Sequence, residues 1–505
     1  MRKVALLSTN SPEKIISHCR KLYNLGWKLL GTRETVMVMK QEGIPIEDVS
    51  EFTNVGYEYG IPPTLHPKIE QALTTNTIER IDLVYDVPYP LNLGNDVGGR
   101  TLLGLGIKGD RIVIMNEKDF KRIIDLLESK KRLPDEVRSE LSAKAAFEIA
   151  SHYLALSQGY SNRHECILGS YTTTCREGEN PYQVPCELFA IDSHDKFALF
   201  RFTQISGEPL CFTNTADMDN VVTTLVKLKA AFTLNFKKTP YIAVAAKHGN
   251  PCGLAVDWNH KDEVITKALW GNPQAVWGGE FICNFTIDKE LSQLLLKSEK
   301  RQQGYGHSKW MLDVIIAPSF SPEAISILGK RKRTKLLINP ALSSSDLLLD
   351  KWSYRFVRGG FLRQPASSYI LSFDSLISKT YDLFGLESIL IAWVVAYTSF
   401  YGGNEIALAK DFRLIGVGGG PSTVMAAQHA VEWSKTYSRD IKNASFAADA
   451  FFPFVDAPEV LVKAGCKSGV VPSGGENHRL VFEYFKNQSV AVGFIPEQYR
   501  GFCRH

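Results

Sequence analysis

The stretch YIAVAAKHGNPCG at residues 241–253 joins an apolar run to a dense group of polar residues. The run at 241–246 is short and continuous, which is typical of a buried strand. Lys247, His248 and Asn250 follow directly at its end. Because ligands in α/β proteins collect beyond the carboxyl ends of strands, these side chains are candidates for a functional site. His titrates near neutral pH, and Lys can stabilise negative charge, although these residues alone leave a structural role for His248 equally open.

A second apolar run, Arg413 to Val417, leads into the glycine-rich segment GVGGGP at 416–421. The larger part of the chain is therefore expected to have two halves. GVGGGP is similar to a dinucleotide-binding loop, but Pro421 replaces its last glycine and no acidic residue follows at the proper distance, so we expect no nicotinamide cofactor. A helix is predicted to begin near Ser422, where its first amides would either bind an anion or continue a plain connecting turn.

Cys252 fits no metal-binding pattern. A zinc deaminase has HxE followed by PCxxC, whereas Leu254 and Ala255 stand where a second thiolate is needed. The nine Cys of the chain include no CxxC pair, which fits reduced thiols better than a disulfide framework or a zinc site. We therefore expect no bound metal.

The composition predicts a folded protein with several domains. At roughly 150 residues per domain, 505 residues suggest two to four units. Hydrophobic residues make up 44% and charged residues 22%, as in globular proteins. The net charge is only +4, so nucleic-acid binding is not expected. No apolar run approaches the roughly 20 residues of a membrane helix, and Met1–Leu7 is too brief for an export signal, which predicts a cytoplasmic protein with no membrane contact.

The amino-terminal part reads as a parallel α/β unit. Apolar segments at Val4–Leu7, 27–30, 83–87 and 111–115 alternate with helical patterns. Ser11 and Asn116 are expected to cap helices, with Pro12 in the first helical turn and Gly26 at the end of the first helix. The charged, proline-containing stretch 129–138 is typical of a linker. We therefore predict domains at 1–130 and 139–505, with a linker at 131–138.

Together these segments resemble the bifunctional purine-biosynthesis family that joins an aminoimidazole carboxamide ribotide (AICAR) transformylase to an inosine monophosphate (IMP) cyclohydrolase. The resemblance covers nearly the whole chain. It is carried by Arg176–Gln183, Lys247–Gly253, Trp277–Gly279, Asp313 before Ile315–Pro318, Asn404 before Leu408–Asp411, Asp449–Phe454 and Arg500–His505.

The resemblance implies an α/β fold, with a methylglyoxal-synthase-like parallel domain followed by a duplicated cytidine-deaminase-like transformylase domain without zinc. It makes His248 the proton acceptor and Lys247 the group that stabilises charge in the transition state. The chemistry agrees, because the AICAR amine is a weak nucleophile that must lose a proton as it attacks the formyl carbon. The oxyanion that forms needs a cation or an amide donor, and Lys247 and Asn404 are suitable.

The same resemblance assigns residues to two small molecules. Around the ribotide it places Arg176, Asn250, Gly278, Asp313, Asn404, Phe451 and Arg500. Near the co-substrate 10-formyltetrahydrofolate it places Met425, Asp456, Gly475 and Glu476. Four positions depart from the family pattern and weaken the expected grip on the substrate: Glu177, Tyr182, Pro421 and Val424. Losing one charge-assisted hydrogen bond costs about 1.5–3 kcal/mol.

The amino-terminal domain resembles the cyclohydrolase through Thr64, Tyr89, Asp96 and Lys108, of which Lys108 is an expected catalytic residue. Its departures are larger. Pro12 replaces a Lys, the phosphate loop reads Arg33–Thr35, and Ile61–Pro63 replaces Arg-Val-Lys. Glu34 would repel a phosphate, although Arg33 compensates in part. Cyclisation and a merely structural or ligand-responsive role stay equally open for this domain.

The function predicted from the sequence is formyl transfer to AICAR in purine biosynthesis, by a homodimer that binds no nucleic acid. Two alternatives stay open. One is a non-catalytic relative that binds a ribotide and regulates another process. The other is a formyltransferase for a different amine, which would fit Glu177 and Tyr182.

Overall fold

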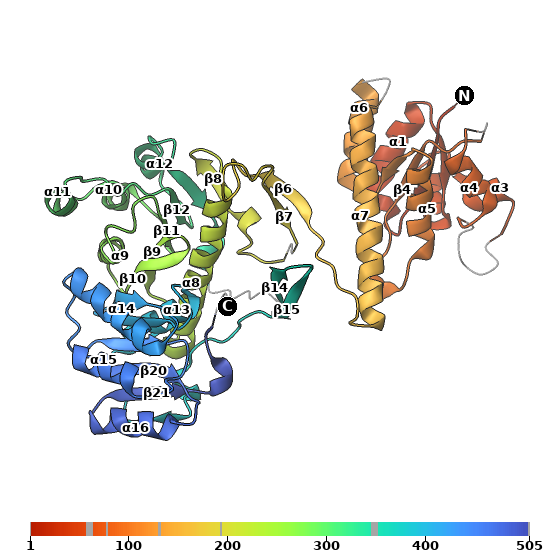
Figure 1. Ribbon diagram of the computed structural model, residues 1–505. Coiled ribbons are helices and arrows are strands. Elements are labelled where there is room, and N and C mark those ends of the chain that lie inside the picture. Colours follow the sequence, from red (N-terminus) through yellow and green to blue (C-terminus); the bar gives the residue numbers. More distant parts are fainter. Residues whose placement is uncertain are drawn as a thin grey trace. The chain divides into compact units, whose positions relative to one another are not determined.

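The computed structural model describes residues 2–56, 64–76, 79–129, 133–191, 194–344 and 352–502. The chain divides into two compact units, Met1–Leu168 and Gly169–His505, which Figure 1 colours from red through yellow to blue along the sequence. Each unit has its own hydrophobic core and is described by itself. None of the described helices is long and apolar enough to cross a membrane.

The first unit contains a five-stranded sheet in the order β3-β2-β1-β4-β5, and every neighbouring pair is parallel. Its strands are β1 (Val4–Ser8), β2 (Lys28–Gly31), β3 (Glu47–Asp48), β4 (Leu83–Asp86) and β5 (Ile112–Ile114). Its helices are η1 (Pro12–Ile15), α1 (Ile16–Asn24), α2 (Arg33–Gln41), α3 (Val49–Thr53), α4 (Pro67–Thr74), η2 (Leu91–Leu93), α5 (Val97–Lys108), α6 (Glu117–Ser129) and α7 (Asp135–Tyr160). The predicted parallel α/β unit is confirmed, because the four apolar runs form β1, β2, β4 and β5 of one parallel sheet.

The predicted helix ends have mixed outcomes. Asn116 accepts a hydrogen bond from the backbone N of Asp119 at 2.8 Å, which confirms it as a cap. Gly26 has φ +86° and follows the end of α1, as predicted. The prediction for Ser11 was wrong, since its side chain caps no helical amide and instead donates to Asn10 at 3.4 Å.

Helix α7 moves the boundary between the units away from the predicted linker at 131–138. This helix packs on α5 and β5, and its buried Leu141 and Ala145 join the core of the first unit. Residues 135–138 of the charged stretch therefore form the first turn of α7, and Leu133 and Pro134 directly precede it. The division between units falls after Leu168.

The second unit is built on a twelve-stranded mixed sheet in the order β16-β21-β20-β19-β17-β18-β10-β9-β11-β12-β13-β8. These strands are β8 (Thr203–Ser206), β9 (Tyr241–Lys247), β10 (Asn250–Asp257), β11 (Glu280–Cys283), β12 (Val314–Ala317), β13 (Lys335–Ile338), β16 (Ser378–Lys379), β17 (Ile406–Lys410), β18 (Arg413–Gly418), β19 (Ser445–Ala448), β20 (Ser468–Pro472) and β21 (Ala491–Ile495). Two separate ribbons pair β6 (Ser170–Thr174) with β7 (Glu187–Ala190), and β14 (Trp352–Val357) with β15 (Gly360–Pro365).

Helices cover both faces of this sheet. Two of them, α8 (Phe212–Phe236) and α13 (Leu386–Thr398), share one core with residues such as Val244 and Ala407. Alternate strand residues, such as Ala243 and Leu408, face two other cores. Those cores also contain residues of α9 (Lys261–Leu269), α10 (Lys289–Leu296), α12 (Pro322–Leu328), α14 (Thr423–Thr436), α15 (Asp456–Ala464) and α16 (His478–Asn487). The remaining helical segments are α11 (Glu299–Tyr305), η3 (Leu199–Arg201), η4 (Pro340–Ser343), η5 (Phe373–Ser375) and η6 (Glu497–Tyr499).

The strand order is the same when read from either edge toward the centre. In each half, an antiparallel hairpin lies at the centre and three mutually parallel strands follow outward: β11, β12 and β13, or β19, β20 and β21. A short antiparallel strand closes each edge. The two hairpins, β9–β10 and β17–β18, meet in the middle of the sheet through β10 and β18.

Candidate functional site

The hairpin between β9 and β10 carries the KHGN segment. Lys247 pairs with Asn250 across the turn, and the two central residues, His248 and Gly249, have φ +53° and +69°. Positive φ at both central residues defines a type I′ turn, whose twist matches that of paired strands. His248 is exposed at the tip, whereas Asn250 is buried.

Lys247 extends from this hairpin toward the start of β11. Its Nζ donates to the carbonyl of Gly278 at 2.7 Å. Glu280, which is 2% exposed, lies close enough for Lys247 to affect its titration. Burial raises the pKa of the Glu280 carboxyl well above its usual range; Asp217 on α8 raises it further, and Lys247 opposes both. The hairpin thus places a cation beside a buried acid whose pKa is raised by burial.

Asp313, at the start of β12, is buried and forms an ion pair with Arg333. The two contacts, from Arg333 Nε and Nη2 to the carboxylate, are both 3.2 Å. Lys335 is almost fully buried at the start of β13. Burial lowers the pKa of Lys335, while the nearby Asp313 carboxylate raises it. Gly278 lies close to both Lys247 and Asp313. A Cβ built on it would be 3.2 Å from Lys247 Nζ and 3.8 Å from Asp313 Oδ2.

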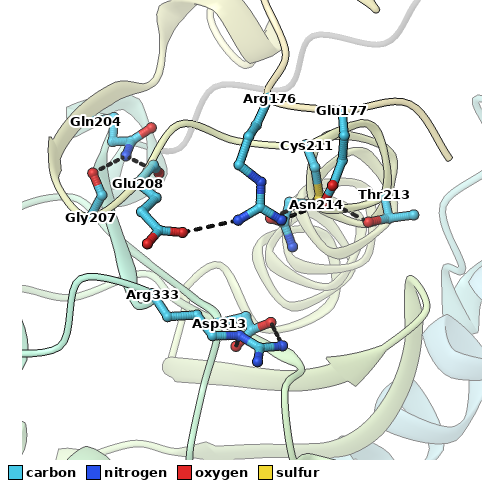
Figure 2. A network of polar contacts seen from close by, with 10 residues as sticks. All are labelled: Arg176, Glu177, Gln204, Gly207, Glu208, Cys211, Thr213, Asn214, Asp313 and Arg333. Atoms are coloured by element: carbon cyan, nitrogen blue, oxygen red, sulfur yellow. Dashed lines mark hydrogen bonds and ion pairs between the residues drawn. The ribbon is translucent and has the colours of Figure 1, made fainter. Parts of the chain in front are cut away.

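Arg176 lies between two carboxylates. It contacts Glu208 at 2.9 Å and forms an ion pair with the adjacent Glu177. Figure 2 shows this network with the Asp313–Arg333 pair in the same region. The field of Arg176 also reaches Lys335 and lowers its pKa. The unexpected Glu177 therefore competes directly for the guanidinium that was predicted to bind the ribotide.

A loop of the second half connects to the hairpin. Asn250 Oδ1 accepts a hydrogen bond from the backbone N of Phe400 at 2.8 Å. In the same loop, Asn404 donates from Nδ2 to Gly420 O at 3.0 Å, and its backbone N bonds the same carbonyl at 3.1 Å. Because β10 and β18 run antiparallel with Ala255 opposite Arg413, the end of β18 and the KHGN turn lie at the same edge of the sheet.

Two buried acids follow Asn404 in this region. The carboxylate of Glu405 accepts from the backbone N of Gly402 at 2.9 Å and of Gly403 at 3.2 Å. The backbone N of Glu405 donates to Asp449 Oδ1 at 2.8 Å. Burial raises the pKa of Asp449 to about 8, and the Glu405 carboxylate adds to this effect.

Phe451 and Arg500, both expected near the ribotide, lie close to one another. The Arg500 guanidinium carbon is 5.6 Å from the centre of the Phe451 ring. Gly475 packs so closely on this ring that a Cβ would lie 2.8 Å from Cε2. Three of the residues expected near the folate, Asp456, Glu476 and Met425, have exposed side chains. Asp456 accepts from Ala457 N at 2.8 Å at the start of α15.

In the first unit, three of the four expected residues gather at the start of α5. Asp96 accepts hydrogen bonds from Gly99 N at 2.8 Å and from Tyr89 N at 3.1 Å. Thr64 Oγ1 lies 3.5 Å from a Cβ built on Gly98. Lys108 is the last residue of α5 and pairs with Glu70 at 3.8 Å. At about 1.5 Å per residue, the helix places Lys108 roughly 18 Å from Asp96 within one chain.

The departures in this unit fall on helix starts. Pro12 opens η1, and Arg33 and Glu34 open α2. Ile61–Pro63 lies outside the described residues. In the second unit Tyr182 is 81% exposed, and Pro421 is exposed just before the N-cap Ser422, whose Oγ accepts from Met425 N at 3.4 Å. The predicted helix start at Ser422 is thus confirmed.

Sequence reasoning missed the buried acids Glu280, Glu405 and Asp86. Asp86 ends β4 and is 3% exposed; burial raises its pKa to about 7, and Asp96 adds to this effect. A usable signal existed, because each acid adjoins an apolar run, where a carboxylate is costly. In the described parts of the chain, no group of three or more His, Cys, Asp or Glu residues is arranged to hold a metal ion.

Comparison with known proteins gives the family. The model of the AICARFT/IMPCHase bienzyme family matches residues 109–433. The bifunctional purine biosynthesis protein PurH of Thermoanaerobacter sp. (strain X514) is 27% identical over 536 residues, covering 98% of each chain. PurH of Petrotoga mobilis is 28% identical over 516 residues, covering 94% of each. The crystal structure of ForH matches 31% of this chain and 98% of its own at 24% identity and TM-score 0.28, a likeness too weak to support an argument.

The fold and the site define a two-unit α/β enzyme whose polar groups gather at the edge of a large mixed sheet. The chain belongs to the AICARFT/IMPCHase bienzyme family. It is therefore a member of the bifunctional enzymes of purine biosynthesis.

Proposed function

We propose that the second unit transfers the formyl group of 10-formyltetrahydrofolate to the amine of AICAR, with His248 as the base. The observation that carries this proposal is the KHGN turn, which presents an exposed His beside a Lys whose amine is fixed at 2.7 Å from Gly278 O. Membership of the bienzyme family supports the choice of donor and acceptor. In fold terms, we assign this unit to a duplicated deaminase-like architecture without zinc.

The reaction forms a bond between the AICAR amine nitrogen and the formyl carbon. His248 takes the amine proton as this bond forms, which removes the positive charge that would otherwise build up on nitrogen. The formyl oxygen becomes an oxyanion, and Lys247 and Asn404 lie at the same sheet edge to stabilise it. The carbon–nitrogen bond to the folate then breaks, and the departing folate nitrogen takes up a proton.

We assign the ribotide to Arg176, Asn250, Gly278, Asp313, Asn404, Phe451 and Arg500, and the folate to Met425, Asp456, Gly475 and Glu476. The ion pair between Arg176 and Glu177 supports a weakened grip on the ribotide phosphate. A carboxylate beside the guanidinium competes with the phosphate, so we expect a raised KM for AICAR while the chemical step persists. The same pair is the observation that favours the second candidate, an amine without a phosphate at this point.

A single-turnover assay tests the proposal. Purified full-length protein is mixed with 10-formyltetrahydrofolate and AICAR, and in parallel with the dephosphorylated riboside. Formylated ribotide formed on the AICAR arm supports the main proposal. Formylation of the riboside alone supports the second candidate, and no formylation on either arm refutes both.

We further propose that the protein works as a cytosolic homodimer, that the first unit is a methylglyoxal-synthase-like cyclohydrolase domain, and that no metal takes part. Asp96 and Lys108 lie at opposite ends of α5 within one chain. If both act on one substrate, a second copy of the chain must supply one of them, which supports the dimer. Sedimentation velocity tests the dimer, since a monomer with full transfer activity would contradict it. Treatment with a zinc chelator is expected to leave transfer unchanged, and activity restored only by zinc would contradict that part.

A further inference from the structure

The second hairpin, β17–β18, repeats the backbone of the KHGN hairpin. Its turn residues Asp411 and Phe412 have φ +50° and +64°, so this is also a type I′ turn. Lys410 precedes it, as Lys247 precedes the first turn. Lys410 Nζ donates to Lys442 O at 2.7 Å, the same length as the bond from Lys247 to Gly278 O.

The segments beside the two hairpins correspond as well. Asn443 has φ +61° and donates from N to the carbonyl of Gly465 at 2.8 Å. In the first half, Gly278 has φ +67° and donates to Met311 O at 2.9 Å. Both acceptors also have positive φ. Lys467 then occupies the place of Asp313, because their backbone N atoms bond Ala444 O and Gly279 O at 3.0 and 2.9 Å.

The region around the second hairpin contains a cavity. A cavity of about 860 Å³ lies there, lined by residues of the hairpin, the start of α13, α9 and the segments before β19, β20 and β21. Small-molecule sites usually have volumes of roughly 300–1,000 Å³. The cavity therefore has room for a small molecule, at a position that repeats the candidate active site in the other half of the unit.

The charges of this cavity differ from those of its counterpart. Strand register places Ser445 where the first half has the buried Glu280, and Lys467 where it has Asp313. Lys267 and Lys410 complete a set of three half-buried lysines on the lining. The two lining carboxylates are Asp411, which is exposed at the turn, and Glu387 on α13.

Two of these lysines have acidic partners elsewhere. Lys410 contacts Asp440, and Lys267 contacts Glu263 at 3.6 Å. Lys467 donates to the carbonyl of Gln488 at 3.3 Å, and no ion pair to Lys467 occurs within the described ranges of the chain. A lysine held on a neutral acceptor at a cavity wall has its charge available for an anion.

We infer that this cavity is a second ligand site, which binds a phosphorylated small molecule through Lys410, Lys467 and Lys267. Lysine ammonium groups suit phosphate because they act as point charges with several donors. Asp411 stands where His248 stands in the first half, so the site lacks the base and binds without formyl transfer. The inference does not depend on the activity proposed for the KHGN site.

Equilibrium dialysis of the full-length protein tests this inference, with inorganic phosphate, ribose 5-phosphate and unphosphorylated ribose as the three probes. We expect ribose 5-phosphate to occupy this site in the wild type. In Lys467→Gln and in Lys267→Gln, the affinity of the site for ribose 5-phosphate should fall about tenfold or more, so that at the same ligand concentration one site fewer per chain is occupied. Phosphate alone should bind more weakly at the same site, and ribose should not bind there.

The matched control is Lys463→Gln, which removes an exposed lysine of α15 that pairs with Glu459 outside the cavity. It should leave stoichiometry and affinity unchanged. Because Lys467 and Lys267 lie on different elements, loss in both variants is not explained by misfolding at one position; circular dichroism checks each. Unchanged binding in either cavity variant, or an equal loss in Lys463→Gln, would overturn the inference.

Discussion

At the residue scale, the exposed His248 and the buried acids Asp86 and Glu280 mark opposite environments for a titratable group. His248 is exposed at the tip of a turn. Asp86 and Glu280 lie where desolvation favours their protonated forms. Both environments yield predictions that separate chemistry from stability.

Replacing His248 with Asn should lower the rate of formyl transfer about 10²–10⁴-fold, because a positioned base contributes that much to a proton transfer. Asn tolerates the positive φ of this position, so the hairpin should keep its shape. Rapid-quench kinetics measure the rate. The control is His260→Asn, an exposed His at the far end of β10, and equal rates in the two variants would refute the assignment.

Replacing Asp86 with Asn should stabilise the first unit above about pH 4. The folded pKa of Asp86, about 7, lies above its unfolded value. The wild type therefore holds an extra proton when folded, and its unfolding free energy falls as pH rises from about 4 to about 7, by up to about 1.4 kcal/mol per pH unit. The Asp86→Asn variant has no carboxyl to ionise at this position, so its advantage should grow through this window.

Hydrogen exchange of β4 peptides in the full-length protein measures this effect at pH 5 and pH 8, after correction for intrinsic rates. Asp110→Asn is the control, since Asp110 is an exposed partner of Arg138, and such pairs contribute little. If β4 protection depends on pH equally in the wild type and in Asp86→Asn, burial does not raise the pKa of the Asp86 carboxyl.

Candidate site residues could be predicted from the sequence where they are close to one another along the chain. Lys247, His248 and Asn250 were found together because they are neighbours in the sequence. The position of Glu280 and Asp217 near Lys247 was not predictable, because it depends on the register of β11 on β9 and on the packing of α8. The exposure of Tyr182 and the pairing of Glu177 with Arg176 likewise depend on tertiary structure.

At the element scale, the β9–β10 turn determines the positions of Lys247 and His248, the proposed catalytic pair. Gly249→Ala should cost about 1 kcal/mol through its positive φ, and its new Cβ would lie 3.4 Å from Asp217 Oδ1 and from Asn220 Cβ. We expect the transfer rate to fall severalfold as the turn shifts.

Gly359→Ala provides the matched control for this turn. Gly359 has φ +76° in the β14–β15 turn, and a Cβ there meets nothing within 4 Å. The Gly359→Ala variant should lose about as much stability as Gly249→Ala, while its rate of formyl transfer stays unchanged. If both variants lose transfer equally, the position of the KHGN turn is not what limits the rate.

Strands were predictable where apolar runs were short and continuous, as at β1, β9 and β18. Helix α7 was not assigned to the first unit because residues 129–138 are charged and the helix has few buried residues: Leu141, Ala145 and His152. Ser11 does not cap a helix because the helical segment after it begins with a 3₁₀ turn, Pro12–Ile15, and the α-helix starts only at Ile16. Local patterns thus predicted the elements, and packing decided the boundary.

A fragment of residues 1–168 should therefore unfold at higher denaturant concentration than one of residues 1–130. The longer fragment keeps α7 on the sheet; the shorter one exposes the surface that Leu141 and Ala145 cover, at about 25 cal/mol per Å² of apolar area. Urea titration followed by circular dichroism compares them. Equal midpoints would restore the predicted boundary at 131–138.

At the scale of the whole molecule, the two units differ in how well the expected residues come together. The second unit brings Lys247, Gly278 and Asp313 into one cluster. The first unit joins Asp96 with Tyr89 but leaves Lys108 at the other end of α5. We therefore expect the chain to release formylated ribotide faster than it cyclises it.

Chromatography of a reaction with AICAR and 10-formyltetrahydrofolate measures both products over time. Losing two phosphate-binding cations costs on the order of 3–6 kcal/mol if their effects add, which is about a hundredfold to ten-thousandfold in affinity. Formylated ribotide should accumulate before IMP appears. IMP formed without such a lag would show that Arg33 or other groups replace the missing cations.

The short strands that close the large sheet also affect how the protein behaves at high concentration. β16 has only two residues, and β8 pairs with β13 through an irregular register. Long regular edges invite other chains to add strands and so promote aggregation, whereas short or irregular ones resist it. Copies of this protein should therefore associate through side-chain surfaces and stay free of fibrils, even though twelve strands lie side by side in each.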